Sequence, residues 1–388
     1  MKGVEYVLKL KIHKLAAAVI AACCAITLAS CGSKGGSSKA NASVTQQTTV
    51  TTTTSITTAT TPAVTQPEET QTTTPEEKPV PQGKYNNLTG EYTLSDAAVG
   101  KRPIAVMVNN ITFSLPQYGI AAADMLIECP VEGTITRLMA VYGDMTKIPN
   151  VCSVRSCRYY FPILAQSFDA VYMHWGKDET VAKDTLESLN IDRLDGYNNS
   201  FVFGRDEERM KTFAYEHTGY YKGPLTEQAL DQSGIRKTLK EDKNKPVFPF
   251  REEAQAVSDT KCTKCKAVFS ADYFSDFAYN ADEDVYYKSH NGAPHIDSST
   301  GQQLAFENVF ILGTTTRIIN QNNLLISLDW HGGDGYYISH GSITPVKWSK
   351  ADEFADIVIT DQNGSVIEVN PGKSYLGFTP RLSDTIYS

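Results

Sequence analysis

Hydrophobic and polar positions divide the chain into a short apolar run, a long polar stretch and a larger region of mixed pattern. Residues 15–28 are apolar, and several lysines precede them. The run is too short for a comfortable membrane span, but it has the length of a signal-peptide core. The first segment therefore indicates export.

Small residues follow this run, in the order Leu28-Ala29-Ser30-Cys31-Gly32. The segment is similar to the lipobox of bacterial lipoproteins, which predicts cleavage before Cys31 and palmitate on its thiol. The alternative is an ordinary signal peptide cut after Ser30, which leaves a bare cysteine. We therefore expect residues 1–31 to be a lipoprotein signal peptide and lipobox. The mature protein would be lipid-anchored to the cell membrane and would face the extracytoplasmic side.

Residues 32–84 are rich in Thr and Pro and offer almost no apolar surface. Such a composition does not offset the entropy lost on ordering, so we expect a disordered linker. A plain flexible tether and an O-glycosylated stalk both fit this composition. In either case the linker keeps the folded part near the membrane.

Residues 85–245 mix strand and helix patterns without strict alternation. Buried strands are expected at 103–109, 124–131, 134–142 and 170–174. Helices are expected at 158–167, 178–189, from Asp206 to about 217, and at 226–240 after Pro224. This pattern predicts a mixed α+β domain.

Residues 246–388 read as short strands separated by turn signals such as Asn291-Gly292 and Asn363-Gly364. The segment 357–369 is the clearest expected hairpin. The predicted fold class is therefore α+β, with an N-terminal mixed α/β domain followed by a mainly antiparallel β domain.

The charge balance narrows the function. A net charge of -8 without a concentrated basic face argues against nucleic acid as a partner. No Walker, dinucleotide-binding or Gly-x-Ser-x-Gly pattern occurs in the sequence, so no cofactor is expected.

Five cysteines remain after the signal peptide and Cys31 are set aside, and an odd number leaves at least one thiol unpaired within the chain. Cys152 and Cys157 are close enough in sequence to bond across a loop. Cys262 and Cys265 form a CxxC pair, for which a disulfide, free thiols, zinc or redox chemistry all remain open. The segment from His290 to His295 with Asp297 offers metal ligands, although turn formation explains it equally well.

Carboxylates, arginines and a histidine gather in the first half of the chain. The candidate ligand-binding residues are Asn109, Asp124, Glu128, Glu132, Arg137, Arg155, Arg158 and His174. Arginines can hold a carboxylate or phosphate in a two-pronged contact, and they can also form a buried structural ion network. Catalysis by paired carboxylates is a third alternative.

Many of these residues lie in blocks that resemble the YerB-like lipoproteins of Gram-positive bacteria. The matching blocks in the first half are 102–110, 123–124 with 128, 131–141, 154–158, 168–170 and 174–176. Those in the second half are Tyr287, 291–292, Asp297, 308–309, 333–335, Trp348 and 370–373. The resemblance implies two linked domains of unknown function, and it implies no activity. The chain departs from the family pattern at 151–153 and in its Cys262/Cys265 pair.

The sequence thus favours a non-enzymatic ligand-binding or scaffold lipoprotein, with cell-wall fragments or an envelope protein as partners. The alternative is a cell-wall-directed hydrolase or transferase that uses Glu128, Glu132, Arg137, Arg155 and Arg158.

Overall fold

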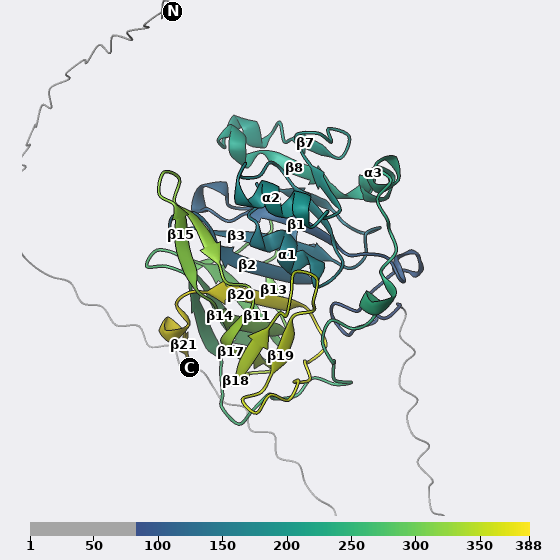
Figure 1. Cartoon of the computed structure of the whole chain (residues 1–388). Helices are drawn as coiled ribbons and strands as arrows, with labels where there is room; N and C mark the ends of the chain where they lie inside the picture. The colour runs from purple at the N-terminus through teal and green to yellow at the C-terminus, as the bar shows by residue number, and fades with distance from the viewer. Residues whose placement is uncertain (1–82) are drawn as a thin grey trace, which may run out of the picture. The chain divides into compact units, whose positions relative to one another are not determined.

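The computed structural model describes residues 83–388 (Figure 1). Cys31, the signal peptide and nearly all of the expected linker lie outside these residues. No helix within the described part is long and apolar enough to cross a membrane.

A ten-stranded sheet takes strands from both halves of the chain (Figure 1). The first half contributes β1 (Ile104–Asn109), β2 (Met125–Pro130), β3 (Thr136–Tyr142), β5 (Val171–His174) and β6 (Arg193–Asp195). The second half contributes β14 (Asn308–Gly313), β17 (Gly332–Ser339), β18 (Ser342–Ser349), β19 (Val358–Thr360) and β20 (Ser374–Thr379). The strand order is β19-β18-β17-β14-β20-β2-β3-β1-β5-β6.

Strand β20 joins the two halves. It pairs in parallel with β14 on one side and with β2 on the other, where Met125 faces Ser374. The sheet is therefore continuous from the first half into the second. The domain boundary expected between residues 245 and 246 stays a prediction.

Runs of buried residues explain the central strands. Every residue of β1, β2 and β3 is buried, as the apolar runs predicted. β2 and β3 are antiparallel and meet at the expected turn, whereas β1 and β5 are parallel. The fold is accordingly α+β, mixed in the first half and mainly antiparallel in the second.

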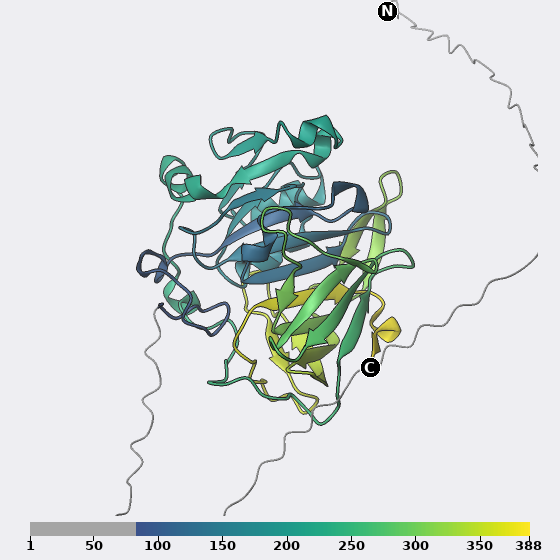
Figure 2. The same cartoon turned by 180° about the vertical axis from the view of Figure 1, so that it is seen from behind.

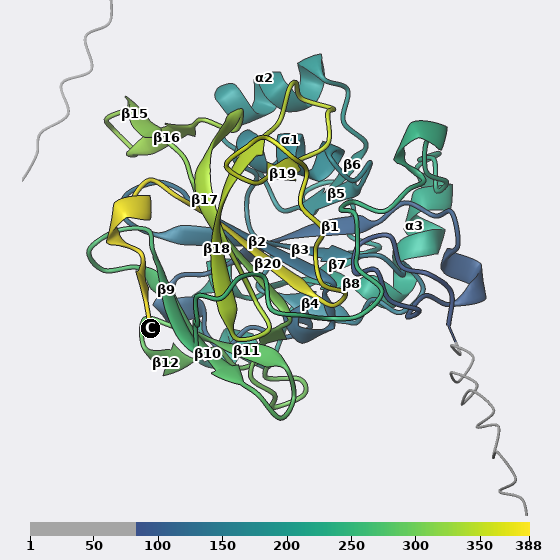
Figure 3. The same cartoon turned by 90° about the horizontal axis from the view of Figure 1, so that it is seen from below.

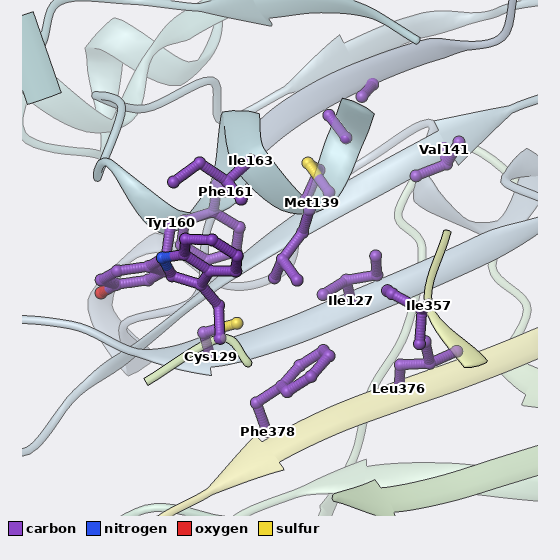
Figure 4. Packing of buried hydrophobic residues seen from close by; sticks show 14 of the residues in the cluster. Ile127, Cys129, Met139, Val141, Tyr160, Phe161, Ile163, Ile357, Leu376 and Phe378 are labelled. Atoms are coloured by element: carbon purple, nitrogen blue, oxygen red, sulfur yellow. The ribbon is translucent and has the colours of Figure 1, made fainter. Parts of the chain in front are cut away.

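One face of the main sheet is covered by helices α1 (Tyr160–Gln166) and α2 (Val181–Ser188). Figure 4 shows part of this core: Tyr160, Phe161 and Ile163 of α1 pack with Ile127 and Met139 of the sheet. Phe310, Leu376 and Phe378 from the second half belong to the same cluster. This apolar cluster thus spans both halves.

Two smaller sheets cover the opposite face (Figures 2 and 3). The first contains β9 (Lys264–Val268), β10 (Phe274–Asn280), β11 (Val285–His290), β12 (Ala293–Pro294), β13 (Ala305–Phe306) and β21 (Ile386–Tyr387). The second contains β4 (Asn150–Cys152), β7 (Phe203–Arg205) and β8 (Gly219–Lys222). The main sheet is therefore the middle layer.

Three local predictions were wrong or too long. The helix expected from Asp206 to 217 is replaced by two short 3₁₀ turns. The Arg209 side chain in this segment donates hydrogen bonds to the distant carbonyls of Ser114 and Pro116, so tertiary contacts determine the local conformation. Helix α3 (Thr226–Gln232) stops early, ahead of Gly234, whose φ is +64°.

Residues 366–369 form only isolated bridges, so the hairpin expected at 357–369 is reduced to β19 and a turn. The structure instead has a hairpin of β15 (Thr316–Asn320) and β16 (Leu325–Leu328).

Candidate functional site

Three candidate residues, Glu132, Arg137 and Arg158, form one ion network at the rim of the main sheet, which we call the rim network. Glu132 lies in the turn between β2 and β3, and it accepts hydrogen bonds from Arg158 Nε (2.8 Å) and Nη2 (2.6 Å). Arg137 Nη2, on β3, donates to the same carboxylate at 2.5 Å. This two-pronged contact is the geometry in which guanidinium binds carboxylate most strongly. The side chains of Glu132 and Arg158 stay 25% and 13% exposed, so the network reaches the surface.

The network keeps its members charged. Burial raises the pKa of Glu132, but Arg137 and Arg158 outweigh burial, and the pKa falls below its ordinary value. Burial, with repulsion from Arg158, lowers the pKa of Arg137 to about 10, which leaves it protonated at neutral pH. A general acid in glycoside cleavage needs a raised carboxyl pKa. Glu132 has the opposite shift.

The segment 153–158 forms a wedge between the carboxyl ends of β1 and β5. Arg155 N donates to Met107 O at 3.1 Å, and Trp175 N donates to Arg155 O at 3.0 Å. Further along, Cys157 N donates to Gly176 O at 2.8 Å. Two parallel strands are thus held apart at their carboxyl ends. In α/β sheets, ligands bind in the crevice outside such strand ends.

Arg155 lies at the outer side of this wedge. Its Nη2 is 3.1 Å from Glu216 Oε2, and the side chains are 22% and 56% exposed. Beside it, Asn109 Nδ2 contacts His217 Nδ1 at 3.0 Å. Because the amide is the donor, His217 Nδ1 accepts this hydrogen bond. Glu216 and His217 were not among the predicted site residues.

A cation–aromatic stack completes the same region. The guanidinium carbon of Arg205 lies 4.1 Å from the ring centre of Trp175 and 4.1 Å from that of Tyr215. Gly196 and Gly219 lie against the Trp175 ring, since an added Cβ would come within 2.5 and 3.0 Å of it. The stack fixes the plane of Arg205 next to the wedge.

Buried polar atoms without a hydrogen-bond partner concentrate here. Within residues 83–388, eight of the thirteen such side-chain atoms belong to residues 137–205. Four of them are N–H donors: Arg137 Nε, Arg155 Nε, Trp175 Nε1 and Arg205 Nε. An unpaired buried donor costs about 1–3 kcal/mol, so native proteins rarely leave several together. These four N–H groups are therefore donors of this region that the protein itself leaves unpaired.

His174 ends β5 beside the wedge and is fully buried. Its Nδ1 lies 2.8 Å from Gly176 O, which can only accept, so Nδ1 carries the proton and the neutral ring leaves Nε2 as an acceptor. Burial lowers its pKa. A polar recess of about 420 Å³ adjoins this position and is lined by Lys177, Asp195 and Asn199 among others.

Glu128 lies within β2, on the face that the smaller sheet with β10 covers. Its Oε1 accepts hydrogen bonds from Asn110 Nδ2 (2.9 Å) and Thr136 Oγ1 (2.7 Å). Its Oε2 accepts from Ser275 Oγ and Tyr375 OH, both at 2.8 Å. The carboxylate is 1% exposed and fully bonded within the protein. Glu128 is therefore separate from the Glu132 network.

The partner charge of Glu128 comes from the second half of the chain. Lys288 Nζ lies 3.5 Å from Glu128 Oε2 and 3.1 Å from His295 Nδ1. Since the ammonium donates, His295 Nδ1 accepts and Nε2 donates to Gln117 Oε1 at 2.8 Å. We call Glu128, Lys288, His290, His295 and their hydrogen-bond partners the buried network.

Charge in the buried network is limited to one pair. Burial raises the pKa of Glu128, but Lys288 and the hydrogen bonds from Thr136 and Tyr375 more than offset this and lower it. Burial, with the nearby Lys288, lowers the pKa of His290 to about 4 and that of His295 well below its usual value. A carboxylate and an ammonium are thus enclosed with two neutral imidazoles.

Asp124 lies at the start of β2, at the other end of the strand from Glu128. Its oxygens accept hydrogen bonds from Asn86 Nδ2 at 2.9 Å and Gly143 N at 2.6 Å. Burial raises its pKa. Of the eight candidates, Glu132, Arg137, Arg155, Arg158, His174 and Asn109 gather around the wedge, whereas Asp124 and Glu128 do not.

All five cysteines in the described part, Cys129, Cys152, Cys157, Cys262 and Cys265, are buried free thiols. The disulfides considered for Cys152 with Cys157 and for Cys262 with Cys265 are therefore not formed in the structure. A hydrogen bond from Cys265 lowers the pKa of Cys262. Residues 83–388 contain no group of three or more His, Cys, Asp or Glu side chains placed to hold a metal.

Sequence reasoning missed Arg205, Glu216, Lys288 and Tyr375. Glu216 fell in the segment expected to be helical and Arg205 directly before it, which hid their approach to the wedge. Lys288 and Tyr375 had no local signal, because their partner Glu128 is more than a hundred residues away in sequence.

Comparison with known proteins identifies the fold. Residues 88–236 match the family described as Protein of unknown function (DUF3048) N-terminal domain, and residues 265–376 match its C-terminal domain. A protein named "Putative lipoprotein YerB" from Bacillus subtilis (strain 168) is 28% identical over 299 residues, which cover 76% of this chain and 86% of that protein.

The crystal structure of the YerB protein from Bacillus subtilis superposes with a TM-score of 0.67 at 27% identity. The match covers 78% of this chain and 98% of that one. The resemblance noted in the sequence is thereby confirmed. The chain belongs to the YerB-like family and carries both of its domains of unknown function.

Proposed function

We propose that this protein is a lipid-anchored, extracytoplasmic lipoprotein that binds an anionic cell-wall fragment at the wedge without altering it. The lipobox-like segment ending at Cys31 and the printed name of the Bacillus relative support the anchor. The expected Thr-rich linker would keep the binding site near the membrane and the wall.

The unpaired donors of Arg137, Arg155, Trp175 and Arg205 carry the binding proposal. A carboxylate or phosphate offers several acceptor lone pairs in one small group, which suits N–H donors that have no acceptor within the protein. Arg155 is partly exposed, so its guanidinium can turn toward a ligand without disturbing the core.

Binding is favoured over hydrolysis by the state of the two carboxylates. Glu132 is held by two arginines, and Glu128 is enclosed by hydrogen-bond donors. Both have lowered pKa values, and neither therefore suits the role of a proton donor at neutral pH.

The anchor is tested by labelling cells with a palmitate analogue. We expect label on the wild-type protein and none on Cys31→Ala. An unlabelled wild type would contradict the anchor and would leave the binding proposal standing.

Binding is tested by calorimetry with a purified disaccharide–peptide wall fragment that bears free carboxylates, using the unlipidated chain from residue 32. Loss of one charged hydrogen bond costs about 1.5–3 kcal/mol, so Arg155→Gln and Arg205→Gln should each weaken binding by roughly tenfold or more. Arg381→Gln, at a distant exposed ion pair, is the matched control. Equal affinity of all four proteins, or cleavage of the fragment, would overturn the proposal.

A further inference from the structure

A second recess lies at the base of the β15–β16 hairpin, which Figure 3 shows projecting from the main sheet. Its volume is about 300 Å³. We call it the hairpin recess. Its lining includes Tyr159, Arg317, Ser327, Asp329, Trp330 and His331. None of these residues belongs to the wedge or to the buried network.

Hydrogen bonds hold the sides of the hairpin recess in place. The Tyr159 hydroxyl donates to Leu328 O and accepts from Leu328 N, both at 3.0 Å, which ties the hairpin to the start of α1. Asp329 Oδ1 accepts from His331 N at 3.0 Å and lies 2.8 Å from its Nδ1. A site built in advance loses little entropy when a ligand binds.

Two stacked rings form one side of the hairpin recess. The rings of Trp330 and His331 lie 3.9 Å apart at an interplanar angle of 21°. Trp330 is 8% exposed, whereas the His331 side chain is 64% exposed. The buried indole therefore supports an imidazole that is open to solvent. Such rings offer a flat surface to the C–H face of a pyranose.

Polar groups surround this flat surface. Hydrogen bonds from the His331 backbone and imidazole lower the pKa of Asp329, so it remains a carboxylate acceptor at neutral pH. Arg317 is exposed on β15 and supplies donors. An acetamido group carries one N–H donor and one C=O acceptor, which complements an acid and a guanidinium that line the same recess. A mixed aromatic and polar lining of this kind is typical of small-ligand sites.

We propose that the hairpin recess binds an N-acetylhexosamine unit of a β-linked glycan. This deepens the proposed function, because it adds an uncharged sugar subsite to a protein proposed to bind wall fragments. It does not depend on the arginines of the wedge.

The test uses the unlipidated chain from residue 32 and the uncharged trisaccharide of β-1,4-linked N-acetylglucosamine, with binding measured by calorimetry and tryptophan fluorescence. Loss of ring stacking or of a hydrogen bond to a charged group costs about 1.4 kcal/mol, so Asp329→Asn and His331→Asn should each weaken binding about tenfold. Asp284 and His340 form a matched exposed pair, with His340 Nδ1 2.9 Å from Asp284 Oδ2. Asp284→Asn and His340→Asn should bind as the wild type does.

The wedge variant Arg155→Gln should also bind the trisaccharide unchanged, which separates this test from that of the anion site. The proposal is overturned if the wild type does not bind the trisaccharide. It is equally overturned if the Asp284 and His340 variants lose as much affinity as those of Asp329 and His331. Urea unfolding of all variants checks that a loss of binding is not a loss of fold.

Discussion

Glu128 and Glu132 lie four residues apart, yet they differ in burial and in the groups that surround them. Glu132 has two arginines, partial exposure and a place at the rim of the sheet. Glu128 has one lysine 3.5 Å away, four hydrogen-bond donors and almost no exposure. The rim network remains in contact with water, whereas the buried network has exchanged water for protein groups.

The difference bears on stability and on function. An enclosed charge must be balanced by the protein alone, so removing its partner is costly. A charge at the rim can be solvated when a partner is lost, and it can also exchange that partner for a ligand. The buried network is thus suited to hold the two halves together, and the rim network to meet a ligand.

The largest expected effect is on the buried network. Lys288→Met leaves the Glu128 carboxylate enclosed without its counter-charge, and we expect the free energy of unfolding to fall by about 3–5 kcal/mol. Urea denaturation measures this change. The double variant Glu128→Gln with Lys288→Met removes both charges and should recover part of the loss. Lys264→Met, at an exposed position of β9, is the control. A Lys288 variant as stable as this control would show that the Glu128–Lys288 pair does not stabilise the fold.

Acid should weaken the same network by a smaller amount. His290 has a folded-state pKa of about 4, below its usual 6.5, so protons bind the unfolded chain more readily. Its contribution is fully present above pH 6.5 and is lost as the pH falls toward 4. Between pH 7.5 and 5 the loss for His290 alone is about 2 kcal/mol. We expect the free energy of unfolding of His290→Asn, measured with urea, to vary much less with pH over this range than that of the wild type. An unchanged pH profile would argue against a neutral buried His290.

The smallest expected effect is at the rim. Arg158→Gln removes the two-pronged contact but leaves Arg137 on Glu132, and partial exposure screens the remaining charges. We expect a loss of about 1 kcal/mol in the free energy of unfolding, reduced further by added salt. Arg381→Gln, in an exposed pair, should change it by less than about 0.5 kcal/mol. A loss at Arg158 as large as that at Lys288 would erase the distinction between the two networks.

Local pattern predicted the central strands and the α1 region because their signals are local. The apolar run of β1 and the turn after β2 need no distant partner to be recognised. The expected helix after Asp206 failed for the opposite reason. Arg209 finds its acceptors at Ser114 and Pro116, which lie more than ninety residues away.

The candidate site was predicted in part. The blocks around Arg137 and Val154–Arg158 identified the rim network and the wedge. The sequence also suggested His290 and His295 as metal ligands or turn residues, whereas both lie in the buried network with Lys288. A sequence lists such groups but does not state which of them meet.

By itself the sequence determined the strand runs of the central sheet, the family and the set of charged residues at the end of β2 and the start of β3. Tertiary structure alone decided which charge each carboxylate meets. Glu128 lies within β2, next to β20 and under β10, whereas Glu132 lies beyond the end of the strand in the turn before β3. Glu128 therefore meets Ser275 and Tyr375, at sequence separations of 147 and 247, while Glu132 remains with its nearer arginines.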